Sequence, residues 1–297
     1  MTARGIKSSH PGNEVRPLER LNGQPSRSRE LIIAVLGAGK IGEAVARAMA
    51  KSPRVSQVLV TKRNVATLGR KLPRKITASS DNVAAAKRAD VVIVAVKAGD
   101  AKHVLDEIST QTHGKLVISF MAAVSLARLE RHLPRAKVVR AMTNMAAVVG
   151  EAATAYSPGP NLTSEDLVVV KFVLGRLGES LELPESQLDA VTALSGSGPA
   201  YIAILIDALV TAGLKVGLPR DTAFKLATQT LVGTSKLLRE TGMSITELRD
   251  AVTTPAGTTI AGIYELEKGS FRTSVINAVE AATQAAERVA KKFEAEH

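Results

Sequence analysis

The sequence contains no cysteine, so it can form no disulfide, use no thiolate nucleophile and hold no cysteine-ligated metal. Tryptophan is also absent, and aromatic residues make up only 3% of the chain. Because proteins that bind single-stranded nucleic acid commonly stack bases on aromatic side chains, this scarcity argues against such a function despite a net charge of +11. We therefore expect no metal and no nucleic-acid partner, and we assign the positive charge to a negatively charged cofactor.

The first 30 residues mix proline, glycine, serine and arginine without periodic apolar positions, which is typical of a disordered tail. A transit peptide is the alternative interpretation. Glu14, Glu19 and Glu30 argue against it, as does the missing apolar face, and no secretory hydrophobic region is present. We expect a cytoplasmic protein whose folded part begins at residue 31.

From residue 31, short β-branched runs alternate with stretches of helical length, which predicts βαβ units. Because these runs are almost entirely apolar, we expect a mainly parallel sheet covered on both faces. The predicted fold of residues 31–184 is thus a doubly wound α/β Rossmann domain. Its expected strands are 31–36, 55–60, 75–79, 90–96, 115–120 and 137–142, with two more at 151–157 and 179–183 and a helix at 163–178 between them.

After Pro184 the strand pattern stops, and residues 185–297 are predicted to form an all-α domain. The expected helices are 185–194, 199–216, 219–241, 244–252, 258–268 and 271–293. The second of these is apolar nearly all round, with Asp207 and Lys215 as its only charges. A membrane span is one interpretation, but the central Asp207 and the polar neighbouring helices argue against it. A helix buried on every side needs more protein than this domain supplies, so we expect a homodimer through these helices.

A glycine motif follows the first strand, at Gly37, Gly39 and Gly42, and runs directly into a helix. Gly37 permits the tight turn, Gly39 lets the backbone approach a pyrophosphate, and Gly42 allows the helix to pack closely on the strand. The amides at the helix start, including those of Lys40 and Ile41, would hold the anion. An ordinary glycine-rich turn is the alternative, but the strand before and the helix after favour dinucleotide binding.

The end of the second strand indicates which dinucleotide binds. NAD sites place an acidic residue there, yet no acidic residue occurs between Glu43 and Asp81. The chain instead has a polar and basic tetrad that could donate charge-assisted hydrogen bonds to a 2′-phosphate, formed by Thr61, Lys62, Arg63 and Asn64. Further bases at 70, 71, 74 and 75 are interpreted as a solvated basic loop. The sequence therefore favours NADPH, with NADH as the alternative.

Two glycine-rich segments with several hydroxyl side chains, 195–199 and 253–259, each precede a predicted helix. Hydroxyls and free amides at a helix start suit a small carboxylate, although two ordinary capped helix starts would look the same. The five histidines, at 10, 103, 113, 132 and 297, all lie away from these segments. Alcohol dehydrogenases generally need an acid or base to move the hydroxyl proton, whereas a protonated imine already accepts hydride at carbon. Imine reduction fits such a site better.

Three stretches carry a resemblance to a known family: DAVTALSGSGPAYI at 189–202, GLPRDTAFKLATQTLVGTSKLL at 217–238, and the long segment 248–283 around TTPAGTT. Over residues 31–293 the chain resembles the pyrroline-5-carboxylate reductases. The resemblance implies NADPH-dependent hydride transfer to the imine carbon of Δ1-pyrroline-5-carboxylate, giving L-proline in the last step of proline biosynthesis. It also implies that helical domains interlock in dimers that can assemble into larger rings. The implied substrate-binding residues are Ser195, Thr254, Gly257, Thr258 and Thr259, with Thr259 taken as catalytic.

The cofactor half resembles the family with several departures. Ala95-Val96-Lys97 matches the family's AVKP segment, with Ala98 in place of proline, and implies a place beside the cofactor. The family's AG pair is Ala122-Ala123 here, and its PGGTT has Ala256 in place of a glycine. Its MPNTP segment reads MTNMA at 142–146, in which Asn144 is kept but both prolines and the threonine are replaced. These departures bear on substrate range and activity.

Three alternative functions remain open from the sequence. One is reduction of a related cyclic imino acid, such as a six-membered homologue. Another is reduction of a different carbonyl in the 6-phosphogluconate-dehydrogenase-like group, against which stands the lack of a lysine in the helix at 199–214. The third is a non-catalytic NADPH-binding relative, against which stands the retained Gly257-Thr258-Thr259 segment.

Overall fold

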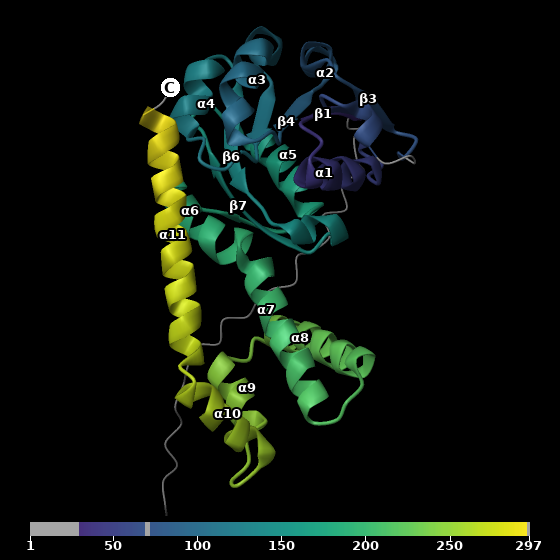
Figure 1. Ribbon diagram of the computed structural model, residues 1–297. Coiled ribbons are helices and arrows are strands. Elements are labelled where there is room, and N and C mark those ends of the chain that lie inside the picture. Colours follow the sequence, from purple (N-terminus) through teal and green to yellow (C-terminus); the bar gives the residue numbers. More distant parts are fainter. Residues whose placement is uncertain (1–29, 69–71, 296–297) are drawn as a thin grey trace, which may run out of the picture.

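The computed structural model describes residues 30–68 and 72–295. The expected tail at 1–30 lies almost wholly outside the described residues, as do Arg70 and Lys71 of the predicted basic loop. Figure 1 shows an α/β part at one end and a helical part at the other. The described residues form an eight-stranded sheet in the order β3-β2-β1-β4-β5-β6-β7-β8, parallel except for the β6–β7 pair. The predicted mainly parallel Rossmann sheet is therefore confirmed.

The strands occupy the apolar runs that the sequence indicated. Their bounds are β1 Leu31–Leu36, β2 Val55–Thr61, β3 Ile76–Ser79, β4 Val91–Val94, β5 Leu116–Ser119, β6 Lys137–Met142, β7 Ala152–Pro158 and β8 Gly178–Glu182. Strand order reverses between β1 and β4, the point at which open α/β sheets bind ligands beyond the carboxyl ends of their strands. The sheet therefore has its crevice beside the glycine motif.

Helices cover both faces of the sheet because alternate side chains of each strand point in opposite directions. In β1, Ile33 and Val35 join the core beneath α1 (Lys40–Ala50) and α5 (Ser164–Gly175), whereas Ala34 and Leu36 join the opposite core. That second core packs under α2 (Asn82–Arg88), α3 (Ala101–Ile108) and α4 (Leu126–His132). All four of these β1 side chains are fully buried.

From residue 185 the described chain is helical, as predicted. The helices are α6 Leu188–Val191, α7 Gly198–Lys215, α8 Arg220–Thr241, α9 Ile245–Ala251, α10 Thr258–Lys268 and α11 Phe271–Ala295. The glycine-rich segment at 195–199 was expected to separate two helices, but it does not. A π-helical turn, Thr192–Gly196, joins α6 almost directly to α7, and Ser197 makes no side-chain cap there. One wide turn keeps the backbone hydrogen-bonded where a loop was expected, and π turns of this kind are frequent at functional sites.

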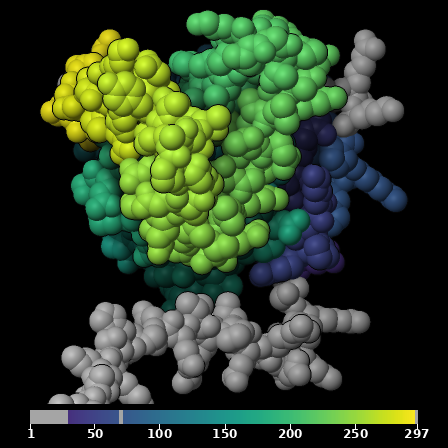
Figure 2. All heavy atoms as spheres, turned by 90° about the horizontal axis from the view of Figure 1, so that it is seen from below, coloured from purple at the N-terminus to yellow at the C-terminus, as the bar shows by residue number. Residues whose placement is uncertain are grey.

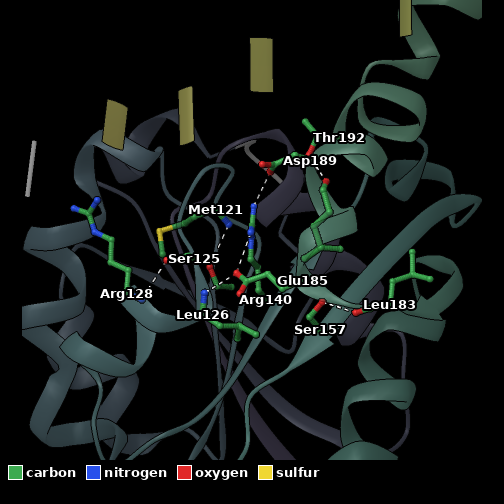
Figure 3. Close-up of polar contacts among 12 residues, drawn as sticks. Met121, Ser125, Leu126, Arg128, Arg140, Ser157, Leu183, Glu185, Asp189 and Thr192 are labelled. Atoms are coloured by element: carbon green, nitrogen blue, oxygen red, sulfur yellow. Dashed lines mark hydrogen bonds and ion pairs between the residues drawn. The ribbon is translucent and has the colours of Figure 1, made fainter. Parts of the chain in front are cut away.

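An ion-pair cluster fixes the junction between the sheet and the helical part (Figure 3). Arg140 on β6 donates to Glu185 at 2.9 Å and to Asp189 at 3.1 Å, and the Glu185 carboxylate also accepts from the Leu126 amide at 2.7 Å. At a second contact, Arg128 on α4 donates to the carbonyl oxygen of Phe293, near the end of α11, at 2.6 Å. Figure 1 shows α11 running along the side of the molecule back to α4. The helical part is thus attached to the sheet at both of its ends.

The helical part exposes much apolar surface. Its one buried apolar cluster among the described residues consists of Val210, Ala223 and Ala227, between α7 and α8. Figure 2, seen from below, shows α7–α8 in green beside α9–α11 in yellow-green to yellow. The stretch Glu185–Lys215 is long and apolar enough to cross a membrane by length and composition, and only 11% of its most apolar window is buried in this chain. Surface of this kind marks a contact region. Its large exposed side chains include Ile202, Ile204, Leu209, Phe224, Leu226, Val232, Tyr264, Leu266 and Ile276.

Tyr156 makes the stability of the fold depend on pH in the alkaline range. Its ring is 1% exposed, its hydroxyl donates to Glu182 at 3.1 Å, and burial raises its pKa to about 12. Because the folded-state pKa lies above the unfolded value of about 10, this stabilisation is complete below pH 10 and disappears between about pH 10 and 12. Between pH 9 and pH 11 we expect the unfolding free energy to fall by about 1 kcal/mol more in the wild type than in Tyr156→Phe. Urea unfolding at pH 9, 10 and 11 measures the difference, and parallel curves for the two proteins would contradict it.

Candidate functional site

The glycine motif forms a tight turn at the carboxyl end of β1. Gly37 has φ +92°, and a Cβ placed on it would lie 2.6 Å from Val96 Cγ1 and 2.8 Å from the Val96 nitrogen. A Cβ on Gly42 would lie 2.2 Å from the Gly37 carbonyl oxygen. A Cβ on Gly39 would meet no atom within 4 Å, so the protein leaves open space above this residue. These three environments match the roles expected of the first, third and second glycine respectively.

The start of α1 adjoins this open space. Gly39 is the N-cap residue and makes no side-chain cap, so the first-turn amides, which have no partner within a helix, remain available to an anion. Ile41 packs against the core and Gly42 is buried, so these two offer only their backbone. Lys40 is exposed and lines a neighbouring hollow of about 510 Å³ between α1 and the short helix η4 (Met145–Val149). The site therefore fits a pyrophosphate.

A groove of about 650 Å³ continues from the glycine turn across the ends of β2 and β4. It brings together most of the predicted cofactor residues: Gly37, Gly39, Thr61, Lys62, Arg63, Asn64, Ala95, Val96 and Lys97 all line it. Every residue that lines the groove falls between Gly37 and Glu107. Among the described residues, those that line the groove therefore all belong to the Rossmann part.

Thr61 of the polar and basic tetrad and Lys75 of the predicted basic loop both have structural roles. Thr61 is 2% exposed, its hydroxyl donates to Asn82 Oδ1 at 2.6 Å, and its carbonyl accepts from the Gly37 and Ala38 amides. Its hydroxyl is thus engaged within the protein, and Thr61 shapes the glycine turn. Lys75 was interpreted as part of a solvated loop, but its ammonium donates to the carbonyls of Ser52 and Val55 at 2.8 and 2.6 Å. That interpretation is wrong for Lys75, because the backbone at the start of β2 offers carbonyl acceptors at two buried residues.

Asn144 links the sheet to the helical part at the edge of the site. Its side-chain oxygen accepts from the Ala146 amide at 3.1 Å, and its Nδ2 donates to both the carbonyl and the hydroxyl of Ser195 at 3.2 Å. The Ser195 hydroxyl in turn donates to the Ala153 carbonyl at 3.1 Å. Both residues were predicted to touch ligands. In this structure they hold each other, and the π-helical turn sets Ser195 against β7.

The predicted substrate loop, 254–259, follows α9 and ends in the first turn of α10. Gly257 caps α10 without a side chain, and its amide donates to the Thr254 carbonyl at 3.0 Å. A Cβ on Gly257 would lie 2.3 Å from Thr254 Oγ1, so only glycine fits beside that hydroxyl. Thr258 and Thr259 are the first two residues of α10 and present the amides and hydroxyls of its first turn. This arrangement suits a small carboxylate.

The loop and the cofactor groove lie apart within one chain. No residue after Glu107 lines the groove, and Figure 1 places α9 and α10 at the end of the molecule away from the sheet. Among the described residues, the hydrogen bonds from Asn144 to Ser195 join a predicted cofactor residue to a predicted substrate residue. Within the described residues of one chain, the predicted substrate segment therefore contributes no side chain to the lining of the groove.

Two alanines of the site have left-handed backbone. Ala123, after β5, has φ +62° and Ala256, in the substrate loop, has φ +58°. Glycine adopts this conformation freely, whereas for alanine it costs about 1 kcal/mol. These are the two positions at which the sequence departs from a family glycine. Both loops thus have, at an alanine, a backbone conformation that glycine favours.

Sequence reasoning missed five polar residues that line the groove: Ser80, Asn82, Asp100, His103 and Glu107. Asn82 accepts from Thr61 and donates to Glu107 at 2.8 Å, and Asp100 accepts from Arg63 at 3.1 Å. The usable signal was their position, since Ser80 and Asn82 follow β3 and the other three follow β4. Residues that come just after parallel strands gather at the same edge of the sheet.

Comparison with known proteins agrees with this geometry. Residues 185–289 match the family described as pyrroline-5-carboxylate reductase dimerisation, and residues 32–123 match the family described as NADP oxidoreductase, coenzyme F420-dependent. The pyrroline-5-carboxylate reductase of Methanosarcina acetivorans is 39% identical over 271 residues, covering 88% of this chain and 98% of that protein. The Arabidopsis thaliana reductase is 37% identical, covering 88% and 96%.

Solved structures give the same result. The Plasmodium falciparum pyrroline carboxylate reductase, crystallised with NADP bound, has a TM-score of 0.80 and 30% identity, and the match covers 89% of this chain and all of that one. A reductase from Coxiella burnetii has a TM-score of 0.81 at 30% identity, covering 88% and 99%. Sequence and structure agree over both the Rossmann and the helical parts, and the chain belongs to the pyrroline-5-carboxylate reductase family.

Proposed function

We propose that this protein reduces Δ1-pyrroline-5-carboxylate to L-proline with NADPH, by hydride transfer to the imine carbon. The observation that carries the proposal is the presence in one chain of a glycine turn with open space above Gly39, a groove whose mouth carries Lys62 and Arg63, and the Thr258-Thr259 helix start. Relatives that match 88% of the chain bear the name of this activity. The proposal places the enzyme in the cytoplasm and divides the chain at 31–184 and 185–297.

The cofactor residues have distinct tasks in this proposal. NADPH, when bound, supplies the hydride. The turn at Gly37 and Gly39 and the first amides of α1 hold the pyrophosphate, and Lys62 and Arg63, with Asn64, hold the 2′-phosphate. Ala95, Val96 and Lys97 form the opposite wall, because the Val96 backbone packs against Gly37. These contacts fix the position of the dinucleotide and contribute through orientation.

The substrate residues bind and orient an anion that is already reactive. A protonated imine accepts hydride at carbon, and this addition converts it directly into a secondary amine. No further proton transfer is needed. Thr258 and Thr259 offer two amides and two hydroxyls at the start of α10 to the substrate carboxylate. Gly257, pressed against Thr254, sets the approach of the loop. Catalysis then consists of holding the ring in line and excluding water.

The site is completed by a second copy of the chain. We infer a homodimer in which the helical part of one protomer covers the groove of its partner, and a larger ring can follow from repeated use of the same surfaces. Two features support this: the exposed apolar side chains on α7–α10, and the separation of loop and groove within one chain. The match of residues 185–289 to a dimerisation family agrees with it.

The activity is tested by following NADPH absorbance with pyrroline-5-carboxylate for wild type, Thr259→Ala and Thr253→Ala. We expect Thr259→Ala to lower kcat/KM about tenfold, since one hydrogen bond to a charged group is lost. Thr253→Ala is the matched control, because its hydroxyl is engaged with the Arg249 carbonyl at 2.7 Å, and it should retain activity. Turnover with a six-membered cyclic imino acid alone would show that the proposed substrate is wrong. NADPH binding without any turnover would refute the proposed enzymatic activity.

A further inference from the structure

An ion pair crosses the mouth of the cofactor groove. Arg63, in the segment after β2, donates from Nη2 to Asp100 Oδ2 at 3.1 Å, and Asp100 lies at the start of α3. Both residues line the groove, one from each wall. The pair therefore spans the opening through which the adenosine end of a dinucleotide must enter.

Asp100 is placed for this pair and not for a local task. It is the N-cap residue of α3, a position at which an aspartate usually accepts from the first-turn amides, yet its side chain makes no cap hydrogen bond. Its carboxylate turns instead toward Arg63. The negative charge of Asp100 also lies beside the basic segment that is predicted to bind the 2′-phosphate. A carboxylate repels a phosphate, so Asp100 does not bind that ligand directly.

We propose that Asp100 is a specificity-determining residue: without a bound cofactor it holds Arg63 as a counter-ion, and it is displaced when the 2′-phosphate of NADPH binds the guanidinium. This inference rests on the proposed role of Arg63 in binding that phosphate. The exchange means that a 2′-phosphate ligand competes with an internal carboxylate, while a ligand lacking the phosphate does not. Asp100 therefore makes the preference for NADPH over NADH smaller than it would be without this carboxylate. It also keeps Arg63 oriented across the groove before the phosphate binds.

The exchange is feasible because the pair is weak. The side chain of Arg63 is 89% exposed and that of Asp100 is 37% exposed. Solvent-exposed pairs contribute little, so a phosphate dianion that accepts charge-assisted hydrogen bonds can replace a single carboxylate. The other titratable residues that line the groove are Lys62, Lys97, His103 and Glu107. Of these, Glu107 lies near the end of α3 and accepts a hydrogen bond from Asn82.

The experiment measures dissociation constants by calorimetry for the purified wild type and variants, with 2′,5′-ADP and 5′-AMP as probes and NADPH and NADH as full ligands. These fragments differ only in the 2′-phosphate and report binding without turnover. We expect Asp100→Asn to tighten 2′,5′-ADP and NADPH about threefold to fivefold and to leave 5′-AMP and NADH unchanged. The control is Asp106→Asn, which removes the same charge from α3, where the carboxylate pairs with His132 and Lys102.

A double-mutant cycle with Arg63→Ala separates the two levels of the proposal. If Arg63→Ala fails to weaken 2′,5′-ADP relative to 5′-AMP, the phosphate assignment itself is wrong. If Arg63→Ala weakens it but Asp100→Asn matches Asp106→Asn, the assignment stands and the exchange is overturned. We expect the Asp100→Asn effect to vanish in the Arg63→Ala background, which would confirm that the carboxylate acts through that guanidinium.

Discussion

Gly39→Ala is expected to weaken NADPH binding about a hundredfold, corresponding to about 2.7 kcal/mol, and to leave the melting temperature nearly unchanged. Gly39 has φ −76° and ψ −167°, which alanine adopts without strain, and a Cβ there would meet no protein atom within 4 Å. The methyl group would instead occupy the open space at the start of α1 where the pyrophosphate is expected to lie. The variant should therefore fold normally and fail to bind.

Two further alanine variants make this result specific. At Gly175, in α5, a Cβ also meets nothing within 4 Å, so Gly175→Ala should keep both binding and stability. At Gly42 a Cβ would lie 2.2 Å from the Gly37 carbonyl oxygen, so Gly42→Ala should lower both the affinity for NADPH and the melting temperature. Calorimetric titration with NADPH and thermal denaturation of all three proteins give the comparison. Wild-type affinity in Gly39→Ala would mean that the phosphate lies elsewhere.

Arg140→Met is expected to lower the melting temperature by about 5–10 °C, because it leaves two carboxylates without their cation at the junction shown in Figure 3. The side chain of Arg140 is 10% exposed, and Glu185 and Asp189 are 31% and 25% exposed. Partial solvation of the carboxylates limits the loss to about 2–3 kcal/mol, less than for a fully buried pair. The methionine keeps most of the apolar volume of the arginine stem, so the effect is mainly electrostatic.

The control for this experiment is Arg249→Met, which removes an exposed arginine from a pair with the adjacent Asp250 and should change the melting temperature by less than about 2 °C. Combining Arg140→Met with Glu185→Gln and Asp189→Asn should recover part of the loss, since no uncompensated charge remains. All variants are compared at one protein concentration, because the melting temperature of an oligomer depends on it. An unchanged melting temperature in Arg140→Met would show that the junction does not need the cluster.

Much of the architecture was predictable because local patterns are strong in this chain. The run at 31–36 followed by Gly37, Gly39 and Gly42 specifies a strand, a turn and a helix through residue volume and backbone freedom, which are local properties. The first and last residues of most helices after 185 were correct within two positions for the same reason. The π-helical turn at Thr192–Gly196 was not predictable, because serine and glycine next to Pro199 are typical of a loop, and packing against β7 and Asn144 overrides that preference.

The sequence by itself determined the Rossmann sheet, the helical second part, the glycine turn and the preference for a phosphorylated cofactor, since each rests on periodicity, on backbone freedom or on the absence of an acidic residue after β2. Only the tertiary structure decided how side chains distant in the chain are used. It engaged Thr61 and Asn144 within the protein, brought Asp100 to Arg63 across 37 positions, and separated the Thr258-Thr259 helix start from the groove of the same chain. Such pairings depend on strand order and domain packing, which no local pattern encodes.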